Sequence, residues 1–147
     1  MRSSTLLRLG GVVGAALFCA AVTTAPAQAA LGPAQPVDIQ LRGYSSTGAE
    51  TQVGRLTGTI RFDDGNSLYR LDVTMNRQSS YVDTKLQIDV NGTAHQAIYQ
   101  SGSLYQDFPY PGTVQNVRLT YEGVYFDGAT NTAKIVKRSA FYDNPFN

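Results

Sequence analysis

The chain has 147 residues and a formal net charge of +1, and this length predicts a single domain. Its one cysteine, Cys19, excludes an internal disulfide framework and a thiolate metal cluster. The near-neutral charge, without any basic run, argues against nucleic acid and anionic membranes as partners.

The first 29 residues have the pattern of a secretory signal peptide. Arg2 and Arg8 lie in a basic start, residues 9–22 are mostly apolar, and Ala27-Gln28-Ala29 is a small-residue cleavage pattern. The apolar run is shorter than the ~20 residues that a membrane helix needs. We therefore expect cleavage after Ala29 and a secreted, extracellular product with no membrane attachment.

After the signal, residues 30–36 contain two prolines, which block regular strand pairing. We expect a flexible N-terminal lead there. Alternation of apolar and polar residues then predicts strands at 37–42, 55–62 and 67–77. The turn Asp63-Asp64-Gly65-Asn66 predicts that the last two strands form a hairpin.

The clearest pattern in the chain is a hairpin centred on Asn91-Gly92. Residues 81–90 alternate without a break, which indicates a strand with one buried and one hydrated face. Asn-Gly is typical of a type I′ turn, because both central residues need a positive φ. Residues 93–100 form the second arm. The side chains expected to face the core from the first arm are Val82, Thr84, Leu86, Ile88 and Val90.

A long connection rich in aromatic residues is expected over residues 101–112, where two prolines interrupt regular pairing. Strand character resumes in two further segments, 113–126 and 132–142, with a turn between them. The core-facing residues expected in the last strand are Ala133, Ile135 and either Ala140 or Tyr142.

These segments amount to about seven short strands, and no run with helical periodicity follows the signal. The sequence therefore predicts an all-β protein with one domain over residues 37–147. The expected architecture is an antiparallel β-sandwich, immunoglobulin-like or jelly-roll-like, because tight hairpins alternate with long crossings. A partly open β-barrel is the alternative.

Four aromatic residues in and beside the expected connection are the best functional candidates: Tyr99, Tyr105, Phe108 and Tyr110. Loops at the end of a rigid sandwich commonly carry binding, and tyrosine offers a large contact area at a small entropic cost. Tyrosine rings also stack on the faces of sugars. The alternative is that the four rings cap the open end of the core. We take these four residues as a candidate binding loop.

No catalytic or metal-binding pattern stands out. His95 is the one histidine, and no Gly-x-Ser-x-Gly elbow accompanies it. The Asp-rich turns at 63–66 and 127–131 offer oxygen ligands of the type calcium prefers, but tight turns require the same residue types. We therefore assign no catalytic residue, no metal site and no cofactor, and we do not expect an enzyme.

The layout is an alanine-rich signal followed by a cysteine-free domain rich in tyrosine and threonine. It resembles small secreted proteins of high-GC Gram-positive bacteria, and this resemblance implies a bacterial origin without implying any site residue. We expect a secreted binding protein that serves as a protein-interaction module, such as an inhibitor or an accessory subunit of an extracellular assembly. The candidate loop, a sheet edge or the N-terminal lead would contact the protein partner.

Two other functions remain open from the sequence. One is a carbohydrate-binding module that uses the same tyrosines, and its partner would be a glycan. The other is a small extracellular hydrolase.

Overall fold

The computed structural model describes residues 29–78 and 83–147. The predicted signal peptide before Ala29 lies outside these ranges, and so do Tyr81 and Val82 of the predicted central hairpin. Within the described ranges, no helix is long and apolar enough to cross a membrane.

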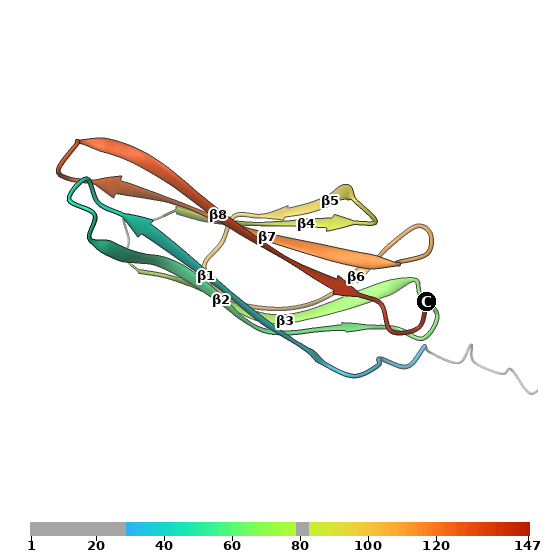
Figure 1. Cartoon of the computed structure of the whole chain (residues 1–147). Helices are drawn as coiled ribbons and strands as arrows, with labels where there is room; N and C mark the ends of the chain where they lie inside the picture. Colours follow the sequence, from blue (N-terminus) through green and yellow to red (C-terminus); the bar gives the residue numbers. More distant parts are fainter. Residues whose placement is uncertain (1–28, 79–82) are drawn as a thin grey trace, which may run out of the picture.

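Eight strands form two antiparallel sheets of four in the described part of the chain (Figure 1). The strands are β1 (Gln35–Tyr44), β2 (Glu50–Phe62), β3 (Leu68–Arg77), β4 (Asp83–Val90), β5 (Thr93–Ile98), β6 (Gly102–Pro109), β7 (Asn116–Asp127) and β8 (Thr132–Asp143). The first sheet has the order β1-β2-β3-β6, and the second has the order β5-β4-β7-β8. The predicted antiparallel β-sandwich is confirmed, and the sheets do not close into a barrel.

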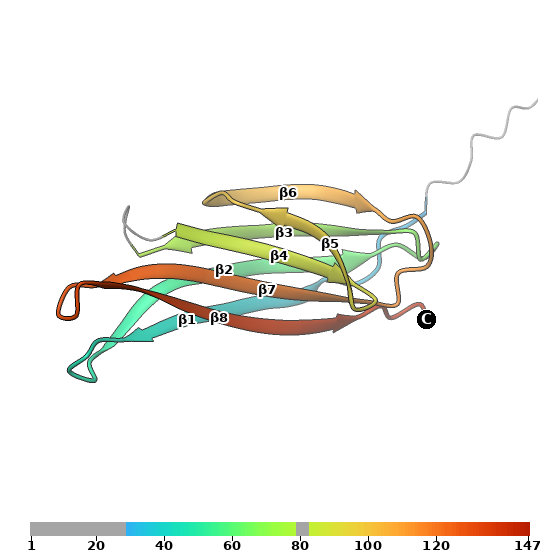
Figure 2. The same cartoon turned by 90° about the horizontal axis from the view of Figure 1, so that it is seen from above.

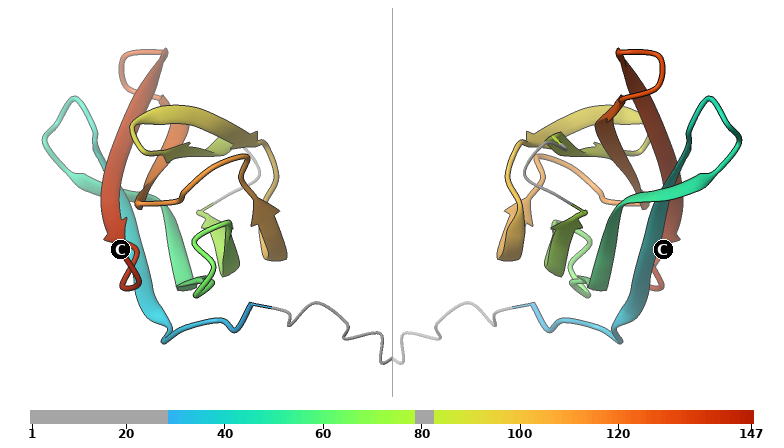
Figure 3. Two further views of the ribbon diagram at one scale, coloured as in Figure 1. Left: turned by 90° about the vertical axis from the view of Figure 1, so that its right-hand side faces the viewer. Right: turned by 90° about the vertical axis from the view of Figure 1, so that its left-hand side faces the viewer.

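The chain crosses from one sheet to the other after β3, β5 and β6, while the remaining connections join neighbours within a sheet (Figure 2). Viewed along the strands, the two sheets form separate layers (Figure 3). The four-plus-four arrangement differs from the four-plus-three arrangement of an immunoglobulin constant domain and has the strand number of a jelly roll.

The core lies between the two layers and takes side chains from both. The largest buried side chains are Tyr69 of β3, Tyr121 of β7 and Phe62 of β2, all with no exposed surface. Leu86, Ile88 and Val90 of β4 are fully buried, as the alternation in that segment predicts. Burying each such aliphatic side chain stabilises the fold by about 1.5–3 kcal/mol.

The predicted Asn91-Gly92 turn is present, with φ of 52° at Asn91 and 80° at Gly92. Asn91 also forms long-range hydrogen bonds, which the local sequence pattern does not indicate. The Asn91 side chain donates to the carbonyl of Thr113 (2.7 Å) and accepts from the amide of Gln115 (2.8 Å). The turn therefore also holds the connection between β6 and β7.

The expected connection over residues 101–112 is wrong, because residues 102–109 form strand β6. This strand pairs with β3 along its whole length, from Leu68 opposite Pro109 to Met75 opposite Gly102. Pro109 is tolerated because it ends an edge strand, where its missing N–H breaks no internal pairing.

The expected orientation of β8 is also wrong at its start. The register places Val124 of β7 opposite Ile135, so Ile135 points outward and is 69% exposed. Ala133 is exposed as well, whereas Tyr142 is buried at the other end of the strand. The turn before β8 fixes this register, and the apolar character of the two residues does not override it.

The segment expected as an N-terminal lead contacts the turn between β2 and β3. The amide of Gly32 donates to the carbonyl of Phe62 (2.8 Å), and the amide of Asp64 donates to the carbonyl of Ala30 (3.0 Å). Strand β1 then begins at Gln35, two residues earlier than the alternation predicts.

Candidate binding surfaces

The four candidate aromatic residues do not lie together. Tyr99 is 76% exposed between β5 and β6, and Tyr105 is 67% exposed in β6. Phe108 is buried in the core, and Tyr110 is partly buried against it. The structure thus separates the predicted loop into two exposed tyrosines and two rings that cap the core.

Phe108 and Tyr110 belong to an aromatic cluster around Tyr69 and His95. The Phe108 ring stacks on Tyr69 with centroids 5.2 Å apart, and Tyr110 meets the His95 ring edge-on at 5.4 Å. The Tyr69 hydroxyl shares a hydrogen bond of 2.8 Å with Nδ1 of His95. Burial raises the pKa of Tyr69, so this hydroxyl keeps its proton. His95 of β5 therefore packs against Tyr69 of β3 and links the two sheets.

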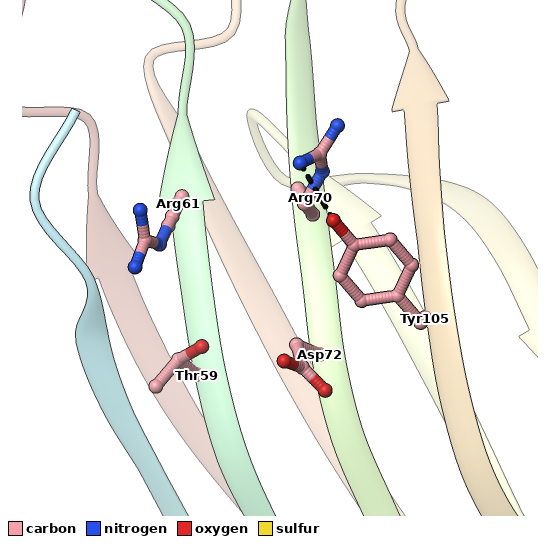
Figure 4. Close-up of a pocket in the computed structure, with 5 residues that line it drawn as sticks. All are labelled: Thr59, Arg61, Arg70, Asp72 and Tyr105. Atoms are coloured by element: carbon pink, nitrogen blue, oxygen red, sulfur yellow. Dashed lines mark hydrogen bonds between the residues drawn. The ribbon is translucent and has the colours of Figure 1, made fainter. Parts of the chain in front are cut away.

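Tyr105 borders a hollow of about 230 Å³ on the outer side of the first sheet. We call it the Tyr105 hollow, and five residues line it: Thr59, Arg61, Arg70, Asp72 and Tyr105. Three neighbouring strands supply them, and alternate residues of a strand point to the same face. Figure 4 shows Arg61 and Thr59 on β2, Arg70 and Asp72 on β3, and Tyr105 on β6.

Arg70 is the fixed centre of this hollow. Its guanidinium donates to both carboxylate oxygens of Asp107, with Nη2 at 2.7 Å from Oδ2, and to the Tyr105 hydroxyl at 2.8 Å. The guanidinium lowers the pKa of Asp107, so this carboxylate stays charged over the neutral range. Tyr105 is thereby held in place while most of its ring remains in solvent.

Arg61 and Asp72 are exposed and form no ion pair with any other residue in the described ranges. Two other arginines on this face do form ion pairs: Arg55 pairs with Asp38, and Arg42 pairs with Glu50. The Tyr105 hollow therefore offers one cation and one carboxylate that form no ion pair within the described part of the chain.

The outer side of the second sheet carries a different surface. We call it the β7–β8 face, and its members are Val124, Phe126, Ala133 and Ile135. Val124 lies opposite Ile135 in the register, and Phe126 lies opposite Ala133. Phe126 is 55% exposed and Ile135 is 69% exposed. Phe141 is also exposed, but it lies towards the other end of β8, opposite Arg118, whose guanidinium lies 5.7 Å from its ring centroid. Apolar side chains thus adjoin one another in solvent at the end of this hairpin.

Two cations that form no ion pair within the described residues lie beside the β7–β8 face. A hollow of about 440 Å³ beside it is lined by Arg118, Lys137 and Arg138, with Asp89 and Glu122 among the other lining residues. Both carboxylates are already engaged, Asp89 by Arg118 and Glu122 by Lys85. Lys137 and Arg138 form no ion pair within the described residues, so this side of the surface is positive.

Comparison with known proteins found no matching family model, no similar curated protein and no similar solved structure. In the ranges that the structure describes, no three His, Cys, Asp or Glu side chains gather in a way that would hold a metal ion.

Sequence reasoning placed Tyr105 among the candidates and missed the residues around it. Alternation does indicate that Arg61 and Arg70 point outward, and the turn at 63–66 places them opposite each other. What no local signal gives is the position of β6 beside β3. The sequence pattern does not indicate the β7–β8 face, because it predicts Ile135 in the core and the register places Ile135 outside.

Proposed function

We propose that this protein is an exported, non-catalytic binding protein whose β7–β8 face docks a protein partner. The observation that carries the proposal is the exposure of Ile135 and Phe126 on adjacent strands of one outer sheet face. Export is proposed from the signal pattern at the N-terminus, and the docking role is proposed from this face.

A protein partner suits this surface better than a small ligand. The apolar side chains lie on the outer side of a sheet and form cross-strand pairs, which gives a broad contact area. Contiguous apolar side chains on a soluble domain commonly mark an interface with another protein. Aromatic residues, the type to which Phe126 belongs, are enriched at the centres of such interfaces.

The charges next to the face indicate what the partner presents. Lys137 and Arg138 have no ion-pair partner within the described residues, and Lys137 lies in β8 two residues after Ile135. A partner with apolar side chains beside carboxylates would cover the apolar β7–β8 face with the former. Its carboxylates would pair with Lys137 and Arg138. The partner is accordingly an acidic protein segment, and its binding weakens as salt rises.

The experiment is capture of a partner by the tagged protein from culture medium and extract of the source organism. A captured protein is identified by mass spectrometry, purified, and titrated calorimetrically against the wild type. In the double variant Phe126→Ser/Ile135→Ser we expect affinity to fall by a factor of ~10 or more, because two apolar anchors are removed. Lys137→Glu should lower the affinity for the partner, and the loss should be larger at low salt than at high salt.

Tyr105→Ser is the matched control, because Tyr105 is similarly exposed but lies on the other sheet. This variant should bind the partner as the wild type does, and circular dichroism should show that every variant is folded. A captured partner that binds the double variant unchanged would overturn the proposal. Dimers in sedimentation that the double variant abolishes would also overturn it, since the occupant would then be a second copy of this chain.

A further inference from the structure

We propose that the Tyr105 hollow is a second binding site and takes a neutral saccharide unit of a glycan. The site lies on the opposite sheet from the β7–β8 face and does not depend on the function proposed above. Its ligand class follows from three properties of the five lining residues: a like-charged pair, a held aromatic ring, and the balance of charge.

The first property is a pair of arginines at one register position. Arg61 of β2 lies directly opposite Arg70 of β3. Like charges opposite each other on one face of a sheet are destabilising. Asp107 neutralises Arg70, but Arg61 has no ion-pair partner among the described residues, although Asp72 lies diagonally across from it. A ligand with oxygen acceptors would supply what Arg61 lacks.

The second property is a ring whose orientation is fixed before any ligand arrives. The Arg70 guanidinium donates to the Tyr105 hydroxyl and lies 5.1 Å from the ring centroid, while 67% of the residue surface stays exposed (Figure 4). An exposed aromatic ring normally loses rotamer freedom on binding, and here that cost is already reduced. Such a ring offers its face to the C–H side of a sugar ring, with its polar hydroxyl already engaged.

The third property is the balance of charge and size. Arg61 and Asp72 carry opposite charges, and Asp107 neutralises Arg70. Thr59 adds a neutral hydroxyl, so the hollow has no net charge and suits a neutral ligand. Asp72 can accept from sugar hydroxyls, and Arg61 can donate to them. A volume of about 230 Å³ is below the ~300–1,000 Å³ of pockets for drug-sized ligands, which suits one sugar unit of a longer chain.

The probes are neutral oligosaccharides built from glucose, xylose, mannose and N-acetylglucosamine, with oligogalacturonate as an acidic comparison. Each is titrated into the purified protein while two-dimensional NMR follows backbone amides of β2, β3 and β6. We expect at least one neutral probe to shift the amides of Thr59, Asp72 and Tyr105 with saturation in the millimolar range or below.

Variants separate the contributions of the lining residues. Tyr105→Ala and Asp72→Asn should each weaken that probe by ~10-fold or more, which is a loss of about 1.4 kcal/mol. Tyr105→Phe keeps the ring but loses the hydrogen bond from Arg70 that holds it, so its affinity should fall less than that of Tyr105→Ala and stay within ~3-fold of the wild type. Tyr99→Ala removes a similarly exposed tyrosine that lies outside the hollow and should have no effect on the affinity for the probe.

Three results would overturn the proposal. One is the absence of amide shifts with every neutral probe at tens of millimolar. Another is saturable binding by oligogalacturonate alone, which would make the site one for anions. The third is neutral-probe binding that survives both Tyr105→Ala and Asp72→Asn. None of these results affects partner capture by the β7–β8 face, so the two proposals fail separately.

Discussion

Gly58 occupies a backbone conformation that other residues rarely adopt, with φ of 143°. A Cβ built there would lie 2.1 Å from the carbonyl oxygen of Asp72 and 2.6 Å from Cα of Val73. β2 and β3 are paired at this point, with Gly58 opposite Val73, so neither strand can withdraw without breaking the ladder. The glycine therefore permits the close approach of two strands that line the Tyr105 hollow.

We predict that Gly58→Ala lowers the free energy of unfolding by about 3 kcal/mol, because it adds both backbone strain and an atomic overlap. Urea denaturation followed by circular dichroism measures the change. Gly128→Ala is the control, since nothing lies within 4 Å of its Cβ position. We expect that control to change stability by less than about 1 kcal/mol. Equal losses in the two variants would contradict this reading of Gly58.

Asp127 is a nearly buried carboxylate with strong local partners. Lys134 Nζ lies 2.6 Å from its Oδ2, and the amide of Ala129 donates to its Oδ1 at 3.1 Å. The Lys134 ammonium and the Ala129 amide lower the pKa of Asp127 to about 2, although burial opposes them. In the unfolded chain the pKa of this carboxyl is about 3.9, so folding favours its charged form.

The depressed pKa sets the sign of the pH dependence. The stabilisation is fully present above about pH 4 and is lost as the pH falls through about 2. We predict that Asp127→Asn lowers the urea midpoint at pH 6 and that the gap to the wild type narrows steadily towards pH 2. Measuring both proteins at each pH cancels the parallel contributions of Asp38 and Asp107. A gap that stays constant between pH 6 and pH 2 would refute the prediction.

At the scale of elements, Tyr125 fastens the β1–β2 hairpin to the β7–β8 hairpin. Its hydroxyl donates to the carbonyl of Tyr44 (3.0 Å) and accepts from the Tyr44 amide (3.1 Å). Gly43 makes room for the ring, because a Cβ there would lie 2.5 Å from it. The two hairpins project at the same end of the sandwich, as Figure 1 shows.

We predict that Tyr125→Phe destabilises the protein by about 1–2 kcal/mol, because it removes two hydrogen bonds with a net value of roughly 0.5–1.5 kcal/mol each. The loss should be local, so hydrogen exchange at the Tyr44 amide should speed up far more than exchange at core amides of β3. Tyr99→Phe, which changes an exposed tyrosine elsewhere, should leave the exchange at Tyr44 as it is. Unchanged exchange at Tyr44 in Tyr125→Phe would show that the hydroxyl does not hold the hairpins together.

The hairpins were predictable from sequence because their signals are local. Asn91-Gly92 and the turn after Phe62 each set the pairing of the strands on either side. Strand β6 was not predictable in this way. Its partner β3 is distant in sequence, and a strand with Gly102 and Pro109 at its ends has the composition of a loop.

The candidate surfaces were also predictable only where local signals, alternation and turns, determine them. Outward positions such as Arg61 and Arg70 follow from alternation, and their pairing follows from the turn between them. Tyr105 joins them only through the long-range pairing of β6 with β3. Ile135 was misplaced because apolar residues were assigned to the core, whereas the register of β7 with β8 turns this one outward.

At the scale of the whole molecule, one core joins two outer faces with different chemistry. The first sheet has a polar outer face with several ion pairs and the Tyr105 hollow, and the second has the β7–β8 face. The inner sides of both sheets interlock through side chains such as Leu71 and Leu119, which have no exposed surface. Packed sheets lie ~10 Å apart, so ligands on the two outer sides cannot touch.

This separation leads to the last prediction, which concerns both surfaces together. Because the two faces are separated by one close-packed core, whose side chains leave little room for a shift, we expect that occupancy of one face does not change affinity at the other. With the best neutral oligosaccharide at saturation, the captured partner should bind with a dissociation constant within ~2-fold of its value without the sugar. Isothermal titration of the partner, with and without the sugar, measures this ratio.

The reciprocal titration supplies the control, since coupling between two sites must be equal in both directions. The variant Tyr105→Ala should bind the partner equally with and without sugar, and Phe126→Ser/Ile135→Ser should bind the sugar as the wild type does. A shift of ~10-fold or more in either titration would mean that the two faces are coupled by about 1.4 kcal/mol through the sandwich. The rigid, two-faced arrangement argued from the buried core would then be wrong.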